Sequence, residues 1–350
     1  MLNLRDLDPR RGLAAVAVAA AVLLAGCAGS EETVAAAASS VPGTHTAPRT
    51  VPAGMGSGQP DAKFPRTVKH FLGATTLDTA PTRVVVISTG QADVLLTLGV
   101  VPAGSTRGDG AETIPQYLKN AFPSYAKQLA AVVDVGSRTD PDVESVANLD
   151  PDLIVLNAAG KDAKSMYAAL SAIAPTVATQ GTGLYWKQDF LLVADALGKT
   201  QQAQGILDAF HRDAEALGAA LTAKPTVSFL RLNGDRLRVF GVPSFAGSIA
   251  EDAGLARPRS QGFAETSQDI STEQLDLGDG DWIFYGVQGG PAKAAALTGM
   301  PLWPTLTAVA GGTAIAVDDD VFYLTPAQPR PAACSRPSVS TCAARSLNFL

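Results

Sequence analysis

The stretch LDPDLIVLNAAG, residues 149–160, decides the fold class. A proline and an acid precede four large apolar residues, and the run stops at Asn157 before small residues. A continuous apolar run bounded by turn formers predicts a strand that is buried on both faces, as in a parallel sheet. In such sheets the ligand crevice lies outside the carboxyl ends of the strands. The stretch therefore makes Asn157 a candidate ligand-binding residue.

The same order of residues recurs later in the chain. Residues 271–290, STEQLDLGDGDWIFYGVQGG, again place Leu-Asp and further acids before an apolar run that stops among glycines. Strand and helix patterns alternate around both copies. They include TRVVVIS before the helical ADVLLTLG, the short strands GVVPAGSTR, AVVDVGSR and APTVAT, and helices at 142–148 and 161–172. This alternation predicts an α/β fold with a mostly parallel sheet and helices on both of its faces.

A long helix is predicted between the two copies. Residues 201–221 contain no proline and place Ile206, Phe210, Ala214, Leu217 and Leu221 on one helical face. Such a helix would run roughly 30 Å and act as a stiff connector. We therefore expect an N-terminal lobe at 67–186 (lobe one), connecting helices at 187–224 and a C-terminal lobe at 225–324 (lobe two).

The N-terminus predicts export. Arginines precede an apolar run from Leu13 to Leu24, which is shorter than the ~20 residues that span a bilayer, so residues 1–26 read as a signal peptide. The segment ends in LAGC, which resembles a bacterial lipobox, and this implies that Cys27 carries a lipid. The alternative is an uncleaved hydrophobic anchor with an incidental cysteine. Because acyl chains tether a protein without spanning the membrane, we expect an extracytoplasmic lipoprotein at the cell membrane.

Composition sets the remaining limits. Residues 27–66 hold almost no large apolar side chain and predict a flexible lipidated tether, in which His45 is solvated. Charged residues make up 17% of the chain and the net charge is −6, so we expect no nucleic-acid partner.

Taken together, these features resemble the class III substrate-binding proteins of ABC importers for ferric siderophores, vitamin B12 and haem. The resemblance covers about 67–324. It rests on APTRVVVIS before a helix, on VGSRTDPDVESVANLDPDLIVL, on the single long helix, and on FAGSIAEDAGL in the second lobe. It implies two Rossmann-like lobes joined by one long backbone helix, with the strand ends at Asn157 and Gly286 aimed at a cleft between them. It also implies a monomeric receptor that passes a ferric siderophore to the subunits of an ABC permease.

Three arginines of one predicted hairpin are candidate ligand-binding residues. In TVSFLRLNGDRLRVF, residues 226–240, the Asn233-Gly234 turn pairs Leu232 with Asp235. That register places on one face Phe229, Arg231, Arg236, Arg238 and Phe240. Neighbouring guanidinium groups repel one another unless something anionic lies among them, which suits an anionic ligand. The alternative is a solvated face, or ion pairs with acids elsewhere.

Lobe one supplies two further arginines at strand ends. Arg107 in GSTRGDG and Arg138 in VGSRTDP lie in loops that would face the crevice. Arg138 matches the position at which hydroxamate-siderophore binders of the resembled family place a ligand arginine. The alternative is a surface loop. Aromatic residues that could cover planar parts of the ligand are Tyr185, Trp186, Phe245 and Phe263. For Trp186 a place in the core is the alternative.

We expect no cofactor and no metal ligand from the protein. His70 and His211 stand alone, and a ferric complex whose organic ligand fills the iron's coordination sphere needs none. No nucleophile elbow, P-loop, zinc motif or dinucleotide fingerprint follows a strand, so we expect no enzyme. The alternatives are a haem or vitamin B12 receptor of the same fold and, from another class, a secreted hydrolase.

The resemblance also implies a docking role for two glutamates. Glu144 and Glu273 lie near the starts of the helices that lead into the repeated strands, where this family places the acids that dock into arginine pockets of the permease. The alternative is that both favour the helix dipole and need no partner. After residue 324 the chain departs from the family: residues 325–350 are an atypical tail without the expected terminal helix.

Overall fold

The computed structural model of the chain describes residues 45–88, 90–108, 112–181 and 183–324. All of them belong to one compact unit, residues 38–350. The predicted signal peptide, the lipidated Cys27 and the atypical tail lie outside the described residues.

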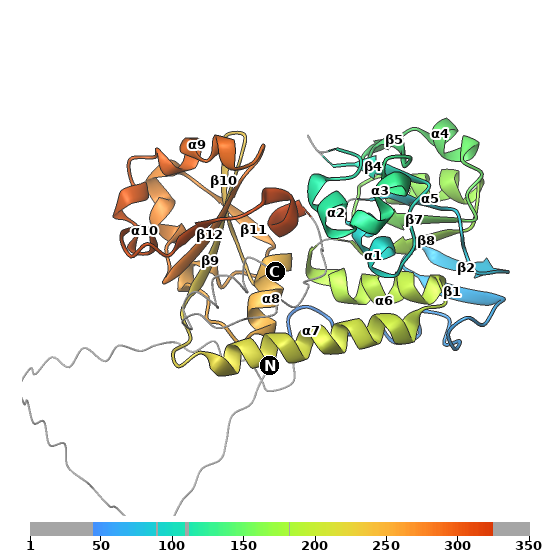
Figure 1. Cartoon of the computed structure of the whole chain (residues 1–350), viewed down its shortest axis with the longest axis horizontal. Helices are drawn as coiled ribbons and strands as arrows, with labels where there is room; N and C mark the ends of the chain where they lie inside the picture. Colours follow the sequence, from blue (N-terminus) through green and yellow to red (C-terminus); the bar gives the residue numbers. More distant parts are fainter. Residues whose placement is uncertain (1–44, 89, 109–111, 182, 325–350) are drawn as a thin grey trace, which may run out of the picture. The chain divides into compact units, whose positions relative to one another are not determined.

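Lobe one is built on a six-stranded sheet in the order β6-β5-β4-β3-β7-β8 (Figure 1). Its strands are β3 (Val84–Ile87), β4 (Gly104–Arg107), β5 (Val133–Ser137), β6 (Asp140–Pro141), β7 (Leu153–Asn157) and β8 (Thr176–Thr179). All neighbours are parallel except β5 and β6. Its helices are α1 (Gln91–Thr97), α2 (Gln116–Ala121), α3 (Ala126–Leu129), α4 (Val143–Asn148) and α5 (Ala163–Ser171). The central strand β3 is fully buried, which confirms the predicted parallel sheet.

Lobe two has a mixed five-stranded sheet in the order β11-β10-β9-β12-β13. The strands are β9 (Val227–Asn233), β10 (Arg236–Phe240), β11 (Ser267–Ile270), β12 (Trp282–Val287) and β13 (Ala314–Ala316). Strand β12 is parallel to β9 and β13, whereas β10 is antiparallel to both of its neighbours. The helices include α8 (Phe245–Asp252), α9 (Ala295–Thr298), α10 (Thr307–Ala310) and the short η4 (Thr272–Gly278) and η7 (Asp320–Leu324).

The predicted hairpin register is wrong by two residues. Its turn is Gly234-Asp235, with a φ of 63° at Gly234, so Leu232 pairs with Leu237 and Arg231 with Arg238. Side chains alternate along a strand with a period of two, so an even shift leaves every residue on its predicted face. The leucine face joins the lobe-two core, and the face with Phe229 and the arginines lies on the other side of the sheet.

The two lobes are joined through α6 (Trp186–Ala196) and α7 (Thr200–Ala220), which pack against each other (Figure 1). The 21-residue α7 lies within one residue of its predicted bounds. Every residue of α6 is buried, and side chains from both helices belong to a core cluster that includes residues of both lobes. Helix α7 lies close to the backbone of Ala253 in lobe two. A Cβ at Gly218 of α7 would lie 2.0 Å from the carbonyl oxygen of Ala253, so this contact requires a glycine.

The acid that directly precedes each of the two repeated strands has a structural role. In lobe one, the carboxylate of Asp152 accepts hydrogen bonds from the backbone N–H (2.7 Å) and the hydroxyl (2.9 Å) of Thr82. In lobe two, Asp281 accepts the same pair from Thr226, at 2.7 and 2.8 Å. Each acid therefore ties the start of β7 or β12 to the start of its parallel neighbour, β3 or β9. The sequence repeat therefore reflects the same hydrogen-bonded connection between neighbouring parallel strands in each lobe.

The structure corrects the predicted boundary of the tether. Residues 45–66 pack on the body: the backbone N–H and hydroxyl of Thr46 donate to Glu251 at 2.8 and 2.7 Å, and Ala47 is fully buried. His45, predicted to be solvated, is half-buried, with Nδ1 3.6 Å from a carboxylate oxygen of Asp252. The prediction failed because it weighed only the shortage of large apolar side chains, whereas polar contacts fasten this segment.

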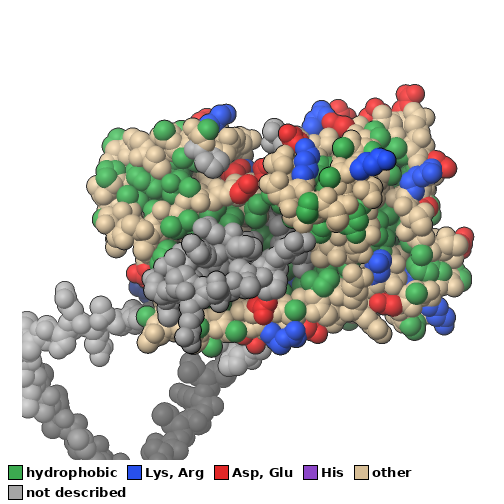
Figure 2. All heavy atoms as spheres, in the orientation of Figure 1, with side chains coloured by type: hydrophobic (Ala, Val, Ile, Leu, Met, Phe, Trp, Pro, Cys, Tyr) green, Lys and Arg blue, Asp and Glu red, His purple; other side chains and the backbone are tan. Residues whose placement is uncertain are grey.

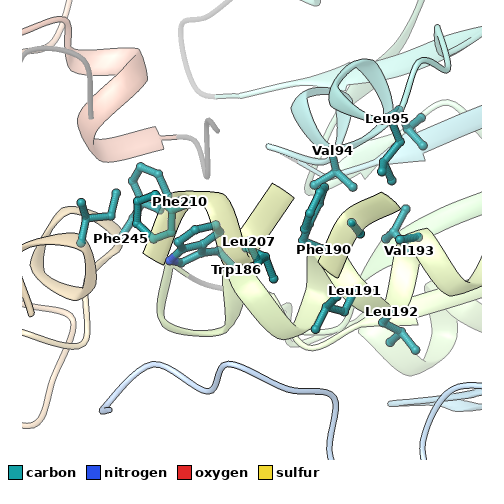
Figure 3. Packing of buried hydrophobic residues seen from close by; sticks show 14 of the residues in the cluster. Val94, Leu95, Trp186, Phe190, Leu191, Leu192, Val193, Leu207, Phe210 and Phe245 are labelled. Atoms are coloured by element: carbon teal, nitrogen blue, oxygen red, sulfur yellow. The ribbon is translucent and has the colours of Figure 1, made fainter. Parts of the chain in front are cut away.

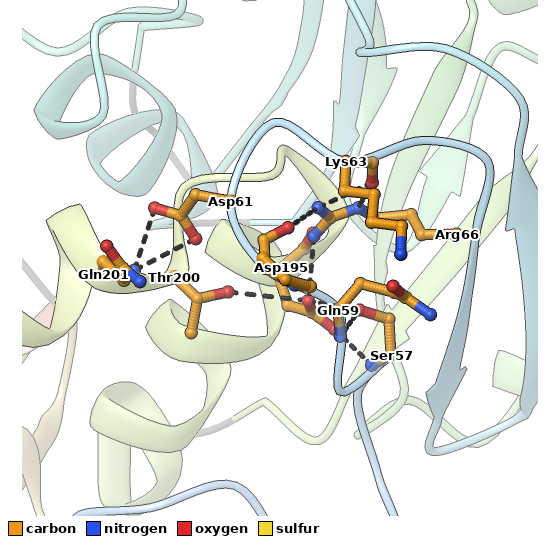
Figure 4. A network of polar contacts seen from close by, with 9 residues as sticks. Ser57, Gln59, Asp61, Lys63, Arg66, Asp195, Thr200 and Gln201 are labelled. Atoms are coloured by element: carbon orange, nitrogen blue, oxygen red, sulfur yellow. Dashed lines mark hydrogen bonds and ion pairs between the residues drawn. The ribbon is translucent and has the colours of Figure 1, made fainter.

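Asp195 at the end of α6 is the main polar anchor of that segment (Figure 4). Its carboxylate accepts a hydrogen bond from the Ser57 hydroxyl at 2.6 Å and pairs with the guanidinium of Arg66 at 3.0 Å. The side chain of Arg66 is fully buried and also donates to the carbonyl oxygens of Pro60 and Lys63. Arg66 opens β1 (Arg66–His70), which forms a two-stranded sheet with β2 (Gly73–Leu77).

Candidate functional site

Two pockets lie at the carboxyl edge of the lobe-one sheet, and both are lined by Ser88, which follows β3. The larger, named here the Arg138 pocket, has a volume of about 150 Å³. It is lined by Ile87, Ser88, Arg138, Thr139, Leu156, Asn157, Ala159, Gly160, Lys161, Asp162, Ala163 and Met166. Arg138 comes from the loop after β5 and Asn157 from the end of β7, so the structure brings two predicted ligand residues together.

Asn157 is held in place by its neighbours. Its side-chain oxygen accepts a hydrogen bond of 2.8 Å from the N–H of Ala159. Gly181 lies against the amide with a φ of 81°, and a Cβ there would be 1.8 Å from the Asn157 oxygen, so this position requires glycine. The Gly181 N–H donates in turn to Asp189 at 2.7 Å. Burial raises the pKa of Asp189 to about 6, and the backbone hydrogen bonds oppose that rise.

The second pocket, named here the Asp93 pocket, was missed by sequence reasoning. It has a volume of about 30 Å³ and lies where β3 and β4 end, beside α1 and α2. Its polar lining residues are Ser88, Asp93, Ser105, Thr106, Glu112, Thr113, Tyr117 and, from lobe two, Asp320. The signal that was overlooked is an acid inside an apolar helix: Asp93 in ADVLLTLG is only 3% exposed.

The structure corrects the assignment of Arg231 as a ligand residue. Its guanidinium forms a bidentate pair with the carboxylate of Asp319, with N···O distances of 2.7 and 2.6 Å, and the residue is 3% exposed. Tyr323 covers the pair and donates hydrogen bonds to the carbonyl oxygens of Leu230 and Phe284. A buried arginine whose charge is already matched has nothing to offer an anionic ligand.

Three other predicted ligand arginines also contact neighbouring side chains of the protein. Arg236 forms a bidentate pair with Asp269 of β11 on the surface, and Arg107 pairs with Asp134 of β5. Arg238 lies half-exposed over the ring of Phe240 at 5.5 Å. Burial, and then the neighbouring Arg231 and Arg236, lower the pKa of Arg238. The alternative given for the hairpin, ion pairs with acids elsewhere, therefore describes Arg231 and Arg236, and Arg107 is ion-paired as well.

Two of the predicted aromatic residues belong to the core. Trp186 is 2% exposed, and its ring meets Phe210 and Phe245 edge to face at 5.5 and 5.4 Å (Figure 3). Its indole N–H donates to the hydroxyl of Ser248 at 3.0 Å. The prediction that Trp186 and Phe245 cover a ligand is therefore wrong, and the core alternative holds. Tyr185 and Phe263 are half-buried and line neither of the two pockets.

The strand end at Gly286 is covered. A Cβ there would lie 2.7 Å from the ring of Tyr323 and 2.9 Å from a carboxylate oxygen of Asp319. The two repeated strands therefore differ at their ends, because Asn157 lines a pocket whereas Gly286 lies beneath the ion pair of Arg231.

Glu144 and Glu273 are both exposed in the first turn of a helix. Asp142 caps α4 by accepting a hydrogen bond from the Ser145 N–H, and Ser271 and Gln274 form a capping box at η4. A hydrogen bond to its own backbone N–H, followed by those from Ser271 and Thr272, lowers the pKa of Glu273. The positions suit either docking or helix capping, and the docking role stays a prediction.

Charges are mixed on the face shown in Figure 2, where Lys and Arg side chains are interspersed with Asp and Glu. Within the described ranges, no group of three or more His, Cys, Asp and Glu residues is placed to hold a metal ion. Burial lowers the pKa of His70 and of His211 to about 4. No helix in the described part of the chain combines the length and apolar character needed to cross a membrane.

Two α/β lobes joined through a long helix form the class III periplasmic-binding-protein fold. The chain belongs to the periplasmic binding protein family, whose model matches residues 84–321. A probable siderophore-binding lipoprotein, YfiY of Bacillus subtilis (strain 168), is 30% identical over 273 residues, which cover 73% of this chain and 81% of that protein. The Fe(3+) dicitrate-binding periplasmic protein FecB of Escherichia coli (strain K12) is 26% identical over 263 residues, or 74% of this chain and 84% of that protein.

Comparison with solved structures identifies the same fold. The crystal structure of Staphylococcus aureus SirA complexed with staphyloferrin B superimposes with a TM-score of 0.62 at 26% identity, covering 74% of this chain and 91% of that chain. The petrobactin-binding protein YclQ of Bacillus subtilis superimposes with a TM-score of 0.61 at 23% identity, which supports the fold alone.

Proposed function

We propose that the chain is an extracytoplasmic receptor that binds a ferric siderophore and delivers it to an ABC permease. The observation that carries the proposal is the Arg138 pocket, in which Arg138, Lys161 and Asn157 converge at the carboxyl edge of a parallel sheet. The relatives and the structural neighbour named above are siderophore-binding proteins by name or by bound ligand, which supports this choice over haem or vitamin B12.

The iron is cargo in this proposal. An organic ligand that fills the coordination sphere of Fe(III) leaves negative charge on its outer oxygens, and the protein then recognises those oxygens instead of the metal. Arg138 is suited to this because a guanidinium donates paired hydrogen bonds to oxygen acceptors. Lys161 adds a second positive charge to the same pocket. No group for bond cleavage is part of the proposal, in keeping with a family of binding proteins.

Arg138→Ala is expected to weaken binding of an anionic ferric siderophore by about 5- to 150-fold, the range for a lost charge-assisted hydrogen bond. The measurement is calorimetric titration with ferric hydroxamates, catecholates and carboxylates, with haem and vitamin B12 in parallel. The matched control is Arg236→Ala, which removes an exposed arginine paired with Asp269 and should leave affinity unchanged. Tight binding of haem with no binding of any ferric siderophore would replace the proposed ligand.

Lipid anchoring through Cys27 is part of the proposal, as is a monomeric state. The relatives YfiY and YhfQ of Bacillus subtilis are named as lipoproteins, which supports an anchor of the same kind. The anchor would hold the receptor at the membrane surface, where a permease is available.

Glu144 and Glu273 are proposed to dock the receptor on the two permease subunits. Two separated, exposed acids, one in each lobe, suit two symmetric basic pockets. The double substitution to Ala is expected to leave ferric-siderophore affinity unchanged while uptake through the cognate permease falls by at least about tenfold, since charged interface pairs contribute up to several kcal/mol. Glu215→Ala, on the exposed surface of α7, is the control. Parental uptake by the double variant would leave both acids as helix-start residues.

A further inference from the structure

The Asp93 pocket differs in charge from the Arg138 pocket beside it. The described residues that line it include the carboxylates of Asp93, Glu112 and Asp320 and no Lys, Arg or His. Glu112 is exposed and pairs with Lys119 at 2.5 Å, so its charge is matched. Asp93 is 3% exposed and forms no ion pair with any described residue. The carboxyl edge of this sheet therefore presents a pocket with two cations and one acid, Asp162, and a second pocket with three acids, and the two share Ser88.

Asp93 lies in the first turn of α1, and its carboxylate accepts a hydrogen bond of 2.8 Å from the hydroxyl of Tyr117. Burial raises the pKa of Asp93 to about 7, against the opposing effect of Tyr117. Burial and the charges of Asp318 and Asp319 likewise raise the pKa of Asp320, and Glu112 adds to that rise. No described cation pairs with the buried carboxylate of Asp93, so the negative charge of this one residue is poorly compensated by the protein itself.

A second observation points to a bound group. The hydroxyl oxygen of Thr106, at the end of β4, is buried and has no hydrogen-bond partner among the described residues, although Thr106 lines the pocket and is 3% exposed. A buried hydroxyl without a partner is destabilising, so such groups are normally satisfied by protein, water or ligand. Thr106 and Asp93 thus offer a hydroxyl and a carboxylate to the same small space.

The size of the pocket limits what can enter it. A volume of about 30 Å³ suits a water molecule or one ammonium head and is too small to enclose a whole ferric complex. A primary ammonium group has one positive charge and three donors, which matches a carboxylate and a free hydroxyl acceptor. A neutral water molecule would satisfy the hydroxyl but would leave the charge unmatched.

We propose that the Asp93 pocket is a subsite for a protonated primary amine on an arm of the ligand, while the Arg138 pocket holds its anionic part. This rests on the proposed function and narrows its substrate class to ferric siderophores that carry a free amine. The ammonium group would donate to the carboxylate of Asp93 and to the hydroxyl of Thr106, while Tyr117 holds Asp93 in position.

The test uses two matched pairs of ferric complexes with the complete mature chain. One pair is a linear trihydroxamate that ends in a primary amine and the same complex with that amine acetylated; the other is a catecholate on a polyamine backbone, with its amine free or acetylated. The parental protein is expected to prefer the free amine in at least one pair by about tenfold or more, as for a charge-assisted hydrogen bond. Asp93→Asn should abolish this preference without weakening binding of the acetylated partner, and Thr106→Val should reduce it.

Asp208→Asn makes the same chemical change on the exposed surface of α7 and should preserve the preference. Asp93→Asn keeps an acceptor for Tyr117, so its melting temperature should not fall below the parental value, which separates loss of recognition from loss of fold. Equal affinity of the parental protein for both members of each pair overturns the amine subsite, as does binding confined to ferric complexes without an amine. Both results leave siderophore binding intact. Failure to bind any ferric complex instead overturns the proposed function, and the subsite with it.

Discussion

Asp252→Ala is expected to lower the free energy of unfolding by about 3–5 kcal/mol, because it leaves a buried ammonium group without its partner. The side chains of Asp252 on α8 and Lys187 on α6 are both fully buried, and their charged atoms lie 2.5 Å apart. Arg49 reaches the other carboxylate oxygen at 2.8 Å. Burial lowers the pKa of Lys187, and Asp252 opposes that shift. The measurement is urea unfolding of the parental and variant proteins.

The control for this prediction removes both charges. In Lys187→Met/Asp252→Leu both fully buried charges are absent and only the partly exposed Arg49 loses a partner, so the double variant should be more stable than Asp252→Ala, even though it lacks the same ion pair. Unfolding of Asp252→Ala at the parental urea concentration would show that Lys187 finds another partner or is neutral in the folded protein.

A chain that begins at Thr67 is expected to be less stable than one that begins at His45, by at least about 3–5 kcal/mol, the effect of breaking one buried ion pair. The shorter chain lacks Arg66, whose fully buried guanidinium matches the charge of Asp195. It also lacks Arg49, which contacts Asp252. Thermal and urea unfolding of the two chains measure the difference directly.

One further variant sharpens that comparison. Arg66→Ala in the longer chain should reproduce a large part of the loss, since it breaks the pair with Asp195 and the hydrogen bonds to Pro60 and Lys63 but keeps the contact between Arg49 and Asp252. Equal melting temperatures for the chains that begin at His45 and Thr67 would mean that residues 45–66 add no stability.

Regular elements were predictable because they depend on local patterns. The buried strand β7 and the single apolar face of α7 follow from the spacing of apolar residues in short windows. The hairpin shows the limit of that reasoning. The turn lies one residue further along the chain than the predicted Asn233-Gly234 turn. The predicted faces of the hairpin are nevertheless correct, because they depend only on the alternation of side chains along each strand.

Partners that are distant in sequence were not predictable. Arg231 pairs with an aspartate 88 residues away, and Ser57 contacts one 138 residues away. No local pattern distinguishes an arginine that meets a ligand from one that meets Asp319. The same limit hid the Asp93 pocket, because its lining residues come from separate strand ends and helices of lobe one and from η7 of lobe two. The place of Arg138 at the edge of a pocket was predictable because it follows a strand end directly, whereas its role in binding stays a prediction.

The packing of residues 45–66 on the body also sets how far the receptor can stand from the membrane. If Cys27 carries the lipid, as proposed, only the 17 residues from 28 to 44 separate it from His45. Whatever their conformation, 17 residues reach at most about 60 Å, whereas the 39 residues of the predicted tether would reach about 140 Å. The shorter tether then keeps the receptor close to the bilayer that holds the permease. Each siderophore-loaded receptor therefore searches only a small volume for its transporter.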